Sequence, residues 1–372
     1  MAIHDIEPGM MIAKPVVNAN NKVLLFPGTK LTRSLIALLS GPWNISSVTI
    51  AEPDDNIKPL PVQPVRQKQE PEKLPAIPHK NIPYKSLQKL FFNNYSSTSD
   101  RVSQIFETYL NTKKLPFLEL RDTSTMVYHS LVETNGSMHF LLLQDHHQGD
   151  YLARHSLAVA VVSGIIGKWL EMNPVDIKQL VFAALLHDIG KTMLPLSLQS
   201  GQNLTTDTEK ELYRMHPGHG AEILSPLKGI PREIVLAVEQ HHEYMDGTGF
   251  PKKLPGNSIH LYARIIALAD TFHTLGGDSE HPNPFDISAK LQQDLNGKLD
   301  PALCDLFARR MSDYLFSNDV LLSDGNQAEV IFLPHTEANK PVVRTKNGDF
   351  IDLRRRQGIT ITGIIKKSPD LI

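Results

Sequence analysis

An apolar run that ends on charged side chains is the first feature of this sequence with chemical meaning. Residues 181–186, VFAALL, have the composition of a buried segment, and His187 and Asp188 follow them directly. Burying an ionised carboxylate without a partner costs several kcal/mol, so a buried carboxylate is normally paired or bound to a metal ion. The rest of the sequence has to supply that partner.

Further histidines and a second aspartate lie inside or at the ends of other apolar stretches. The full set is His155, His187, His216, His241 and His242 with Asp188 and Asp270. Taken singly, each is more typical of a satisfied core residue than of a ligand. Taken together, imidazole and carboxylate ligands favour Fe, Mn or Zn over Mg or Ca, which prefer oxygen ligands alone.

The size of this set predicts two ions rather than one. Seven ligands exceed what one ion takes while keeping a position open, and Asp188 is the natural bridge between two. Two adjacent ions suit phosphoryl chemistry, because they lower the pKa of a bound water and neutralise charge in the transition state. Lys191, one helical turn after His187, is expected to contact a phosphate oxygen, with a solvated lysine as the alternative.

Long helices are expected to position these side chains. Residues 84–318 carry helical spacing, and YLARHSLAVAVVSGIIGKWLEM and SIHLYARIIALADTFHTL are apolar enough to be central. Asn173 and Pro174 predict a helix start, and PREIVLAVEQHH is expected to begin on Pro231. A capping box is predicted from Thr206 to Glu209.

The regions outside this helical part differ in composition. Residues 1–52 predict a small α/β or β-rich accessory domain, with strands in KVLLFPGTKL and VTIAEP and a helix in LTRSLIALLS. Residues 53–83 contain eight prolines and predict a semi-extended linker. Residues 319–372 predict a small β-rich C-terminal domain, because short β-prone runs alternate with turns.

The bulk composition excludes several classes of protein. One cysteine, Cys304, excludes a disulfide framework and a cysteine-based metal site. A net charge of −2 gives no signature for a nucleic-acid polymer. We expect no membrane insertion, because no apolar run approaches the roughly 20 residues of a membrane helix. The N-terminus lacks the pattern of a signal peptide, so a cytoplasmic location is expected.

The stretch from Tyr151 to Leu275 resembles the HD-GYP family, a branch of the HD phosphohydrolase superfamily. The matching segments are YLARHSLAVA, AALLHDIGK, RMHPGHGAEIL, HHEYMDGTGFPKKLPG and ARIIALADTFHTL. The resemblance implies a mainly α fold, an HD-type helical bundle carrying a dinuclear metal site. It also implies a metal-dependent phosphodiesterase that opens cyclic di-GMP to linear pGpG by attack of a metal-activated hydroxide on phosphorus, with either pGpG or GMP as the final product.

The resemblance also assigns roles to residues. The metal ligands that the resemblance implies are His155, His187, Asp188, His216, His241, His242 and Asp270. They would hold two divalent ions, for which Fe or Mn is expected in preference to Zn. The resemblance implies that Asp188 and Lys191 are catalytic residues and that Lys191 also contacts a substrate phosphate. The remaining substrate contacts are Gly247, Gly249, Phe250 and Pro251, with Phe250 in place of the family's tyrosine.

A departure from the family's pattern keeps other functions open. The segment GGDSEHPNPFD, where the family carries basic residues, has Asp278, Glu280 and Asp286 instead. One alternative is therefore a protein of low activity that acts as a cyclic dinucleotide sensor or scaffold, reaching other signalling proteins through its terminal domains. Another is a phosphohydrolase of a different nucleotide. Tyr151 stands where some members carry a third-metal glutamate, so we expect two ions, not three.

Overall fold

The structure is a computed structural model, and part of the chain is described in it. The described residues are 2–17, 23–25, 27, 29, 31, 36, 39, 45–51, 84–134, 150–201, 204–277, 283–293, 297–315, 318–334, 337, 339–356 and 358–365. The predicted linker and most of the predicted helix in LTRSLIALLS lie outside these residues. Asp278 and Glu280 also lie outside them, whereas Asp286 is in the first turn of a helix.

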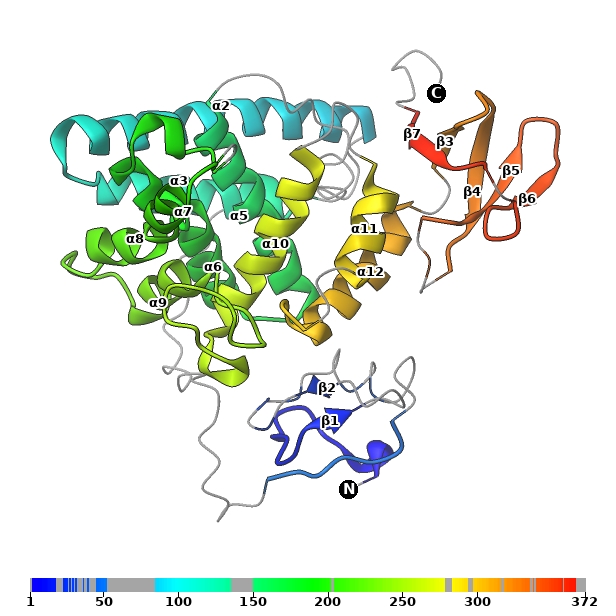
Figure 1. Cartoon of the computed structure of the whole chain (residues 1–372), viewed down its shortest axis with the longest axis horizontal. Coiled ribbons are helices and arrows are strands. Elements are labelled where there is room, and N and C mark those ends of the chain that lie inside the picture. Colours follow the sequence, from blue (N-terminus) through cyan, green and yellow to red (C-terminus); the bar gives the residue numbers. More distant parts are fainter. Residues whose placement is uncertain are drawn as a thin grey trace.

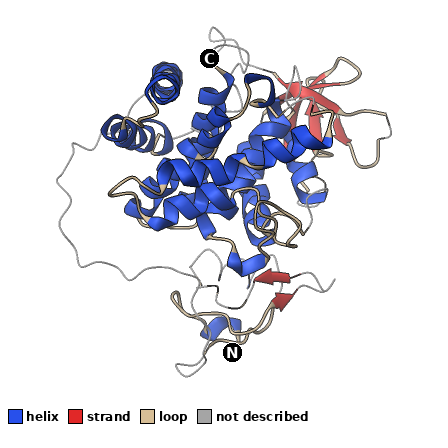
Figure 2. Ribbon diagram, turned by 60° about the vertical axis from the view of Figure 1, so that its left-hand side comes forward, coloured by secondary structure: helices blue, strands red, loops and turns tan. Residues whose placement is uncertain are grey.

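Helices make up most of the described chain, which confirms the mainly α fold class (Figures 1 and 2). The helices are α2 (Tyr84–Thr112), α3 (Phe117–Val127), α5 (Tyr151–Trp169), α6 (Pro174–Leu186), α7 (Asp207–Arg214), α8 (His216–Leu224), α9 (Arg232–Gln240), α10 (Leu261–Gly277), α11 (Pro284–Gln293) and α12 (Pro301–Leu315). Shorter helical turns are η1 (Ile3–Asp5), a π-helical turn η3 (Tyr128–Val132), η4 (Ile189–Met193), η5 (Leu196–Leu198) and η6 (Gly256–Ser258).

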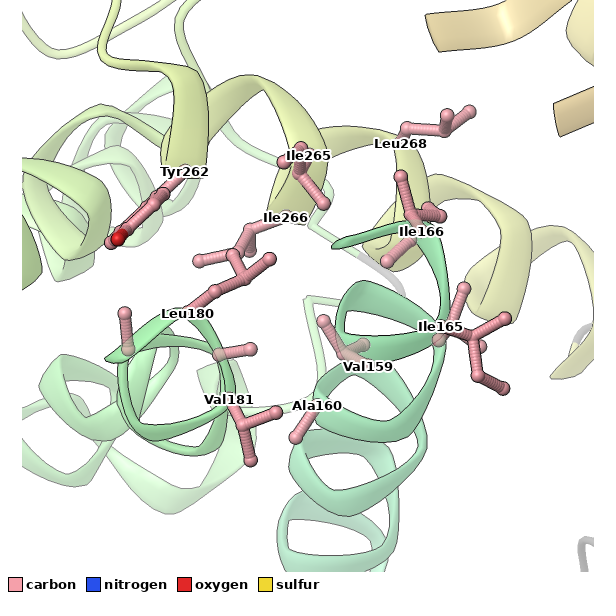
Figure 3. Packing of buried hydrophobic residues seen from close by; sticks show 14 of the residues in the cluster. Val159, Ala160, Ile165, Ile166, Leu180, Val181, Tyr262, Ile265, Ile266 and Leu268 are labelled. Carbon is pink, nitrogen blue, oxygen red and sulfur yellow. The ribbon is translucent and has the colours of Figure 1, made fainter. Parts of the chain in front are cut away.

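Three apolar helices, α5, α6 and α10, form the centre of the hydrophobic core. Figure 3 shows Val159 and Ile166 of α5, Leu180 of α6 and Ile266 of α10 packed together, and all four side chains are buried. Full burial of one such side chain contributes about 1.5–3 kcal/mol. This packing fixes the helices whose ends and inner faces carry the predicted ligands.

Local capping sets the ends of these helices as the sequence predicts. The Asn173 side chain accepts hydrogen bonds from the first turn of α6, and Pro174 is its first residue. The capping box of α7 is present, since Thr206 and Glu209 each accept a backbone hydrogen bond from the other. The predicted start of α9 was one residue early, because Pro231 is the extended N-cap and the helix begins at Arg232.

Strands are confined to the two ends of the chain. The C-terminal sheet is antiparallel, in the order β6-β5-β4-β3-β7, and Figure 1 shows it beside α11 and α12. Its strands are β3 (Asp319–Leu322), β4 (Gln327–Phe332), β5 (Val342–Thr345), β6 (Phe350–Asp352) and β7 (Ile361–Ile364). Phe285 of α11 and Leu315 of α12 share its core, which joins the sheet to the helices.

The N-terminal unit contains the pair β1 (Val16–Val17) and β2 (Val23–Leu25). In VTIAEP, residues 48–51 are described and contain an isolated bridge at Ile50 instead of a strand, so that prediction was wrong in extent. The Asn257 side chain donates a hydrogen bond to the carbonyl of Pro27, which ties this unit to η6. Among the described helices, none is both long enough and apolar enough to cross a membrane.

Candidate metal centre

The predicted ligands come together from five separate elements. His155 lies within α5, His187 caps α6, His216 begins α8, His241 caps α9 and Asp270 lies within α10. Asp188 and His242 each follow a capping histidine. The side chains form two groups suited to a metal ion, and Asp188 belongs to both. One contains Asp188, His216, His241 and His242, and the other contains His155, His187 and Asp188.

Asp188 is the geometric centre of the cluster. Its Oδ2 atom lies 3.4 Å from the Nε2 atoms of both His155 and His187. Its Oδ1 atom lies 3.2 Å from Nε2 of His216 and 3.8 Å from Nε2 of His241. The side chain is 1% exposed, and among the described residues neither oxygen has a partner with hydrogen-bond geometry.

Backbone carbonyls fix the ring orientation of three histidines. The Nδ1 atoms of His187, His216 and His241 each lie within hydrogen-bond distance of the carbonyl three residues earlier. The acceptors are Ala184 at 2.8 Å, Tyr213 at 2.7 Å and Val238 at 2.7 Å. Because a carbonyl only accepts, Nδ1 carries the proton and the Nε2 lone pair faces Asp188.

This donor set fits a metal ion. Several Nε2 lone pairs and two carboxylate oxygens point at one another, which is unfavourable unless a cation lies between them. Burial lowers the pKa of His216, and burial with neighbouring imidazoles lowers the pKa of His241 and brings that of His242 to about 3. These rings are therefore neutral, which is the form that binds metal.

The carboxylates behave in the opposite way. Burial acts to raise the pKa of Asp188, but the Lys191 ammonium and His187 outweigh it and hold the pKa well below its usual range. Asp270 lies 3.1 Å from Nε2 of His155, and that contact likewise outweighs burial and lowers its pKa. Asp270 is outside both ligand groups, and its contact with His155 links it to the cluster.

His155 differs in its electrostatics. Burial acts to lower its pKa, but the nearby carboxylates of Asp188 and Asp270 raise it to about 8. Its ring stacks on Tyr151, with 5.6 Å between centroids and 7° between planes. Asp150, the residue beside Tyr151, is the N-cap of α5 and accepts the Leu152 amide, so its carboxylate has a structural role.

Lys191 is placed differently from the prediction. Helix α6 ends at Leu186, and Lys191 lies in η4, so it does not follow His187 on one continuous α-helix. Its ammonium forms an ion pair with Asp188, 2.6 Å from Oδ2, and lies 5.2 Å from the Tyr213 ring centroid. The side chain is 5% exposed, so the alternative of a solvated lysine was wrong.

Two glycines allow η4 and α8 to approach each other. A Cβ atom on Gly190 would overlap the carbonyl oxygen of His216 and lie 2.6 Å from the amide nitrogen of Gly220. On Gly220, a Cβ atom would lie 2.6 Å from the Val238 side chain. The close contact brings Asp188, at the start of η4, to His216, at the start of α8.

The loop that carries Phe250 is held by a buried glutamate. The Glu243 carboxylate accepts hydrogen bonds from the amides of Lys252, at 2.6 Å, and Leu254, at 2.8 Å. The amide of Phe250 donates to the carbonyl of His242. Gly249 is required there, because a Cβ atom would overlap the backbone of residues 242–244.

Phe250 consequently lies against the metal-ligand candidates. Its ring stacks on His242, with 4.7 Å between the centroids, and the Arg214 guanidinium lies 5.9 Å from the Phe250 centroid. The ring centroid of Phe250 also lies 6.4 Å from that of His216, and the role of Phe250 as a substrate contact stays a prediction, as do those of Gly247, Gly249 and Pro251.

Four residues near the cluster were missed in the sequence: Tyr213, Arg214, Glu243 and His273. Tyr213 and Arg214 lie at the end of a polar helix, and Glu243 lies in a loop, so no periodic pattern distinguishes them. His273 follows Asp270 by three residues on a helix, and that spacing could have placed it on the same face.

Comparison with known proteins gives this cluster a family. An HD domain matches residues 140–303. A cyclic di-GMP phosphodiesterase of Pseudomonas aeruginosa, PA4108, is 29% identical over 184 residues, covering 49% of this chain and 44% of that protein. This chain contains an HD domain and is similar to HD-GYP proteins. The chain shares a fold with the HDG"Y"P protein Bd1817 from Bdellovibrio bacteriovorus, with a TM-score of 0.53 and 19% identity over 63% of this chain and 75% of that chain.

Another relative has a different name. The 3'3'-cGAMP-specific phosphodiesterase 3 of Vibrio cholerae is 32% identical over 157 residues, covering 41% of this chain and 33% of that protein. The chain thus spans about half the length, or less, of these curated relatives. HD-domain proteins bind divalent metal ions, and the His/Asp cluster lies within the matched residues.

Proposed function

We propose that this protein is a metal-dependent phosphodiesterase that hydrolyses cyclic di-GMP to linear pGpG and onward to GMP. The observation that carries the proposal is the position of Asp188, shared by two groups of imidazoles with its oxygens outside hydrogen-bond geometry. The names of the relatives supply the substrate class, since proteins similar over the HD domain are cyclic di-GMP phosphodiesterases.

The residues that would hold the metal are those of the two groups, with Asp270 joining on the side of His155. We propose two ions per chain, Fe or Mn, bridged by Asp188. When bound, they would supply Lewis acidity and a water of lowered pKa. The protein contributes neutral imidazoles with fixed tautomers and a carboxylate that stays ionised.

Two cationic side chains are available for the phosphates of the substrate. Coulombic attraction to Asp188 outweighs burial and raises the pKa of Lys191, so its ammonium stays charged. Arg214 lies over the Phe250 ring, beside His242. We propose that Lys191 contacts a phosphoryl oxygen near the ions and that Arg214 meets the second phosphate or a base edge. These cations offset the acidic character of the segment after α10.

The Phe250 loop completes the proposed substrate site. The Phe250 ring has one face on His242, and an aromatic ring at this position is suited to stacking with a nucleobase. The glycines at 247 and 249 keep the loop backbone close to residues 242–244, and Gly247 has a φ of 76° that favours glycine.

The test is a product analysis. Protein loaded anaerobically with Fe(II) or Mn(II) is incubated with cyclic di-GMP, and in parallel with 3'3'-cGAMP, and the products are separated by chromatography. The proposal predicts pGpG, followed by GMP, from cyclic di-GMP. Faster turnover of 3'3'-cGAMP would favour the second candidate, a phosphodiesterase of the mixed dinucleotide, which the Vibrio relative supports. Tight binding of either dinucleotide without turnover would contradict an enzyme and favour a sensor.

A further inference from the structure

His155 differs from three of the other clustered histidines in the group that its Nδ1 atom faces. The Nδ1 atoms of His187, His216 and His241 face backbone carbonyls, whereas Nδ1 of His155 faces Nδ1 of His273 at 3.0 Å. His155 is on α5 and His273 is on α10, so this contact links the two central helices at the cluster.

The inner edge of His155 determines which ring donates. Its Nε2 atom lies 3.1 Å from Oδ1 of Asp270, 3.4 Å from Oδ2 of Asp188 and 3.2 Å from Nε2 of His187. An Nε2 atom that binds a cation among these groups must present its lone pair. The neutral His155 ring then carries its proton on Nδ1 and donates it to Nδ1 of His273.

The His155 ring is restrained from two directions. Tyr151 stacks in parallel on its face, and His273 meets its edge with 4.9 Å between the ring centroids and 64° between the planes. His155 is 2% exposed, so water is largely excluded as an alternative acceptor for Nδ1. The acceptor at His273 therefore determines how the ring is oriented.

We propose that His273 is a positioning residue, which accepts the Nδ1 proton of His155 and so aims its Nε2 at the ion held by His155, His187 and Asp188. The inference rests on the metal site of the proposed function. An uncharged acceptor adds less electron density to a ligating imidazole than a carboxylate does. A carboxylate at position 273 would therefore strengthen the binding of the ion beside His155.

Three substitutions separate positioning from packing. His273→Asn places Oδ1 where Nδ1 was, because both atoms branch from Cγ, and so keeps a neutral acceptor. His273→Asp keeps the shape and adds charge, whereas His273→Leu removes the acceptor. His129→Leu is the control, since His129 is partly exposed and pairs with Glu133 in another part of the protein.

The readout is Zn(II) binding, measured by competition with a chelator, together with the ¹⁵N shifts of the imidazoles in the Zn(II)-loaded protein. His273→Leu is expected to weaken one of two ions by about 10–100-fold, as loss of an outer-shell partner does. His273→Asn should restore most of that affinity, and His273→Asp should bind more tightly than His273→Asn. In the parent protein, His273 should carry its proton on Nε2, and its Nδ1 atom should be unprotonated.

Either of two results would overturn the inference while leaving the proposed function in place. One is wild-type affinity for both ions in His273→Leu. The other, which requires no variant to fold, is a parent spectrum with His273 protonated on Nδ1. Equal affinities of the Asn and Asp variants would refute the charge effect. Failure of the parent protein to bind Zn(II) at all would overturn the metal site and this inference together.

Discussion

At the level of single residues, Asp188 is the side chain whose surroundings depend most on a bound cation. Its carboxylate is buried, and four imidazoles and one ammonium lie within 4 Å of its oxygens. Lys191 is the cationic side chain nearest to this carboxylate, at 2.6 Å from Oδ2. A metal ion on each side would let both oxygens act as ligands.

Asp188→Asn is therefore expected to abolish the shared ligand while keeping the shape of the side chain. The loss of metal content and of hydrolysis should exceed the roughly 10–100-fold cost of losing an outer-shell partner. Metal analysis and turnover of cyclic di-GMP check this. Asp207→Asn, at an exposed carboxylate in the first turn of α7, is the control and should retain both. If Asp188→Asn still binds two ions, the proposed bridging role of Asp188 is wrong.

The sequence predicted the individual residues of the cluster but not their partners. The adjacent pairs His187-Asp188 and His241-His242 stand out because they end apolar helices, where burying a polar side chain costs free energy unless it has a partner. Arg214 and Glu243 give no such signal, because they lie in polar or irregular segments. Their importance arises from contacts between helices and loops that are distant in sequence, such as Arg214 with Phe250.

At the level of elements, the contact between η4 and α8 sets the geometry of the cluster. Gly190 and Gly220 lie face to face, and η4 replaces what would otherwise be a continuation of α6. The 3-10 turn redirects the chain, so Lys191 meets Asp188 instead of lying one α-helical turn beyond His187. Helical periodicity alone could not reveal this change, because it depends on the fit between two backbones.

Gly190→Ala should disrupt that fit. The added Cβ atom overlaps the His216 carbonyl, so η4 must move away from α8 and separate Asp188 from His216. We expect a loss of about 1–3 kcal/mol in the free energy of unfolding, together with loss of bound metal. Gly218→Ala, in α8, is the control, because nothing lies within 4 Å of its added Cβ atom. Equal metal content in the two variants would contradict the argument.

The start of α10 is expected to make stability depend on pH. His260 accepts the Tyr262 amide on Nδ1, and burial lowers the His260 pKa from 6.5 to about 4. The unfolded chain then binds a proton at a higher pH than the folded chain does. This contribution is complete above about pH 6.5 and is lost progressively as the pH falls toward 4.

His260→Asn tests this dependence, because its Oδ1 atom can replace Nδ1 as the helix cap but does not titrate. Between pH 7.5 and pH 5, the parent protein should lose about 2 kcal/mol more of its free energy of unfolding than the variant loses. Denaturant titration of the metal-free proteins at the two pH values measures the difference. Parallel losses in both proteins would show that His260 is not the group responsible.

At the level of the whole molecule, both terminal units contact the helical part. The C-terminal sheet shares its core with α11 and α12, and the N-terminal unit reaches η6 through Asn257. Gly256 of η6 donates to the carbonyl of Met245, so this contact continues into the loop that carries Phe250. A role for the terminal units in binding signalling partners stays a prediction.

Sequence composition was enough to predict where the chain changes from helical to β-rich, but it could not predict which parts of the chain contact each other. The change from helical to β-prone sequence near residue 318 coincides with the end of α12 at Leu315 and the start of β3 at Asp319. The domain boundaries themselves remain predictions. The hydrogen bond from Asn257 to Pro27 joins residues far apart in sequence, and neither residue type signals it.

The most direct test of the account is the metal stoichiometry and magnetic coupling of protein loaded anaerobically with Mn(II). Two ions that share a carboxylate lie roughly 3.5–4 Å apart and are magnetically coupled. The shared position of Asp188 predicts two Mn(II) per chain and an electron paramagnetic resonance spectrum of a coupled pair, which Asp188→Asn should abolish. One ion per chain with the spectrum of isolated Mn(II), or a reproducible count near three, would contradict it.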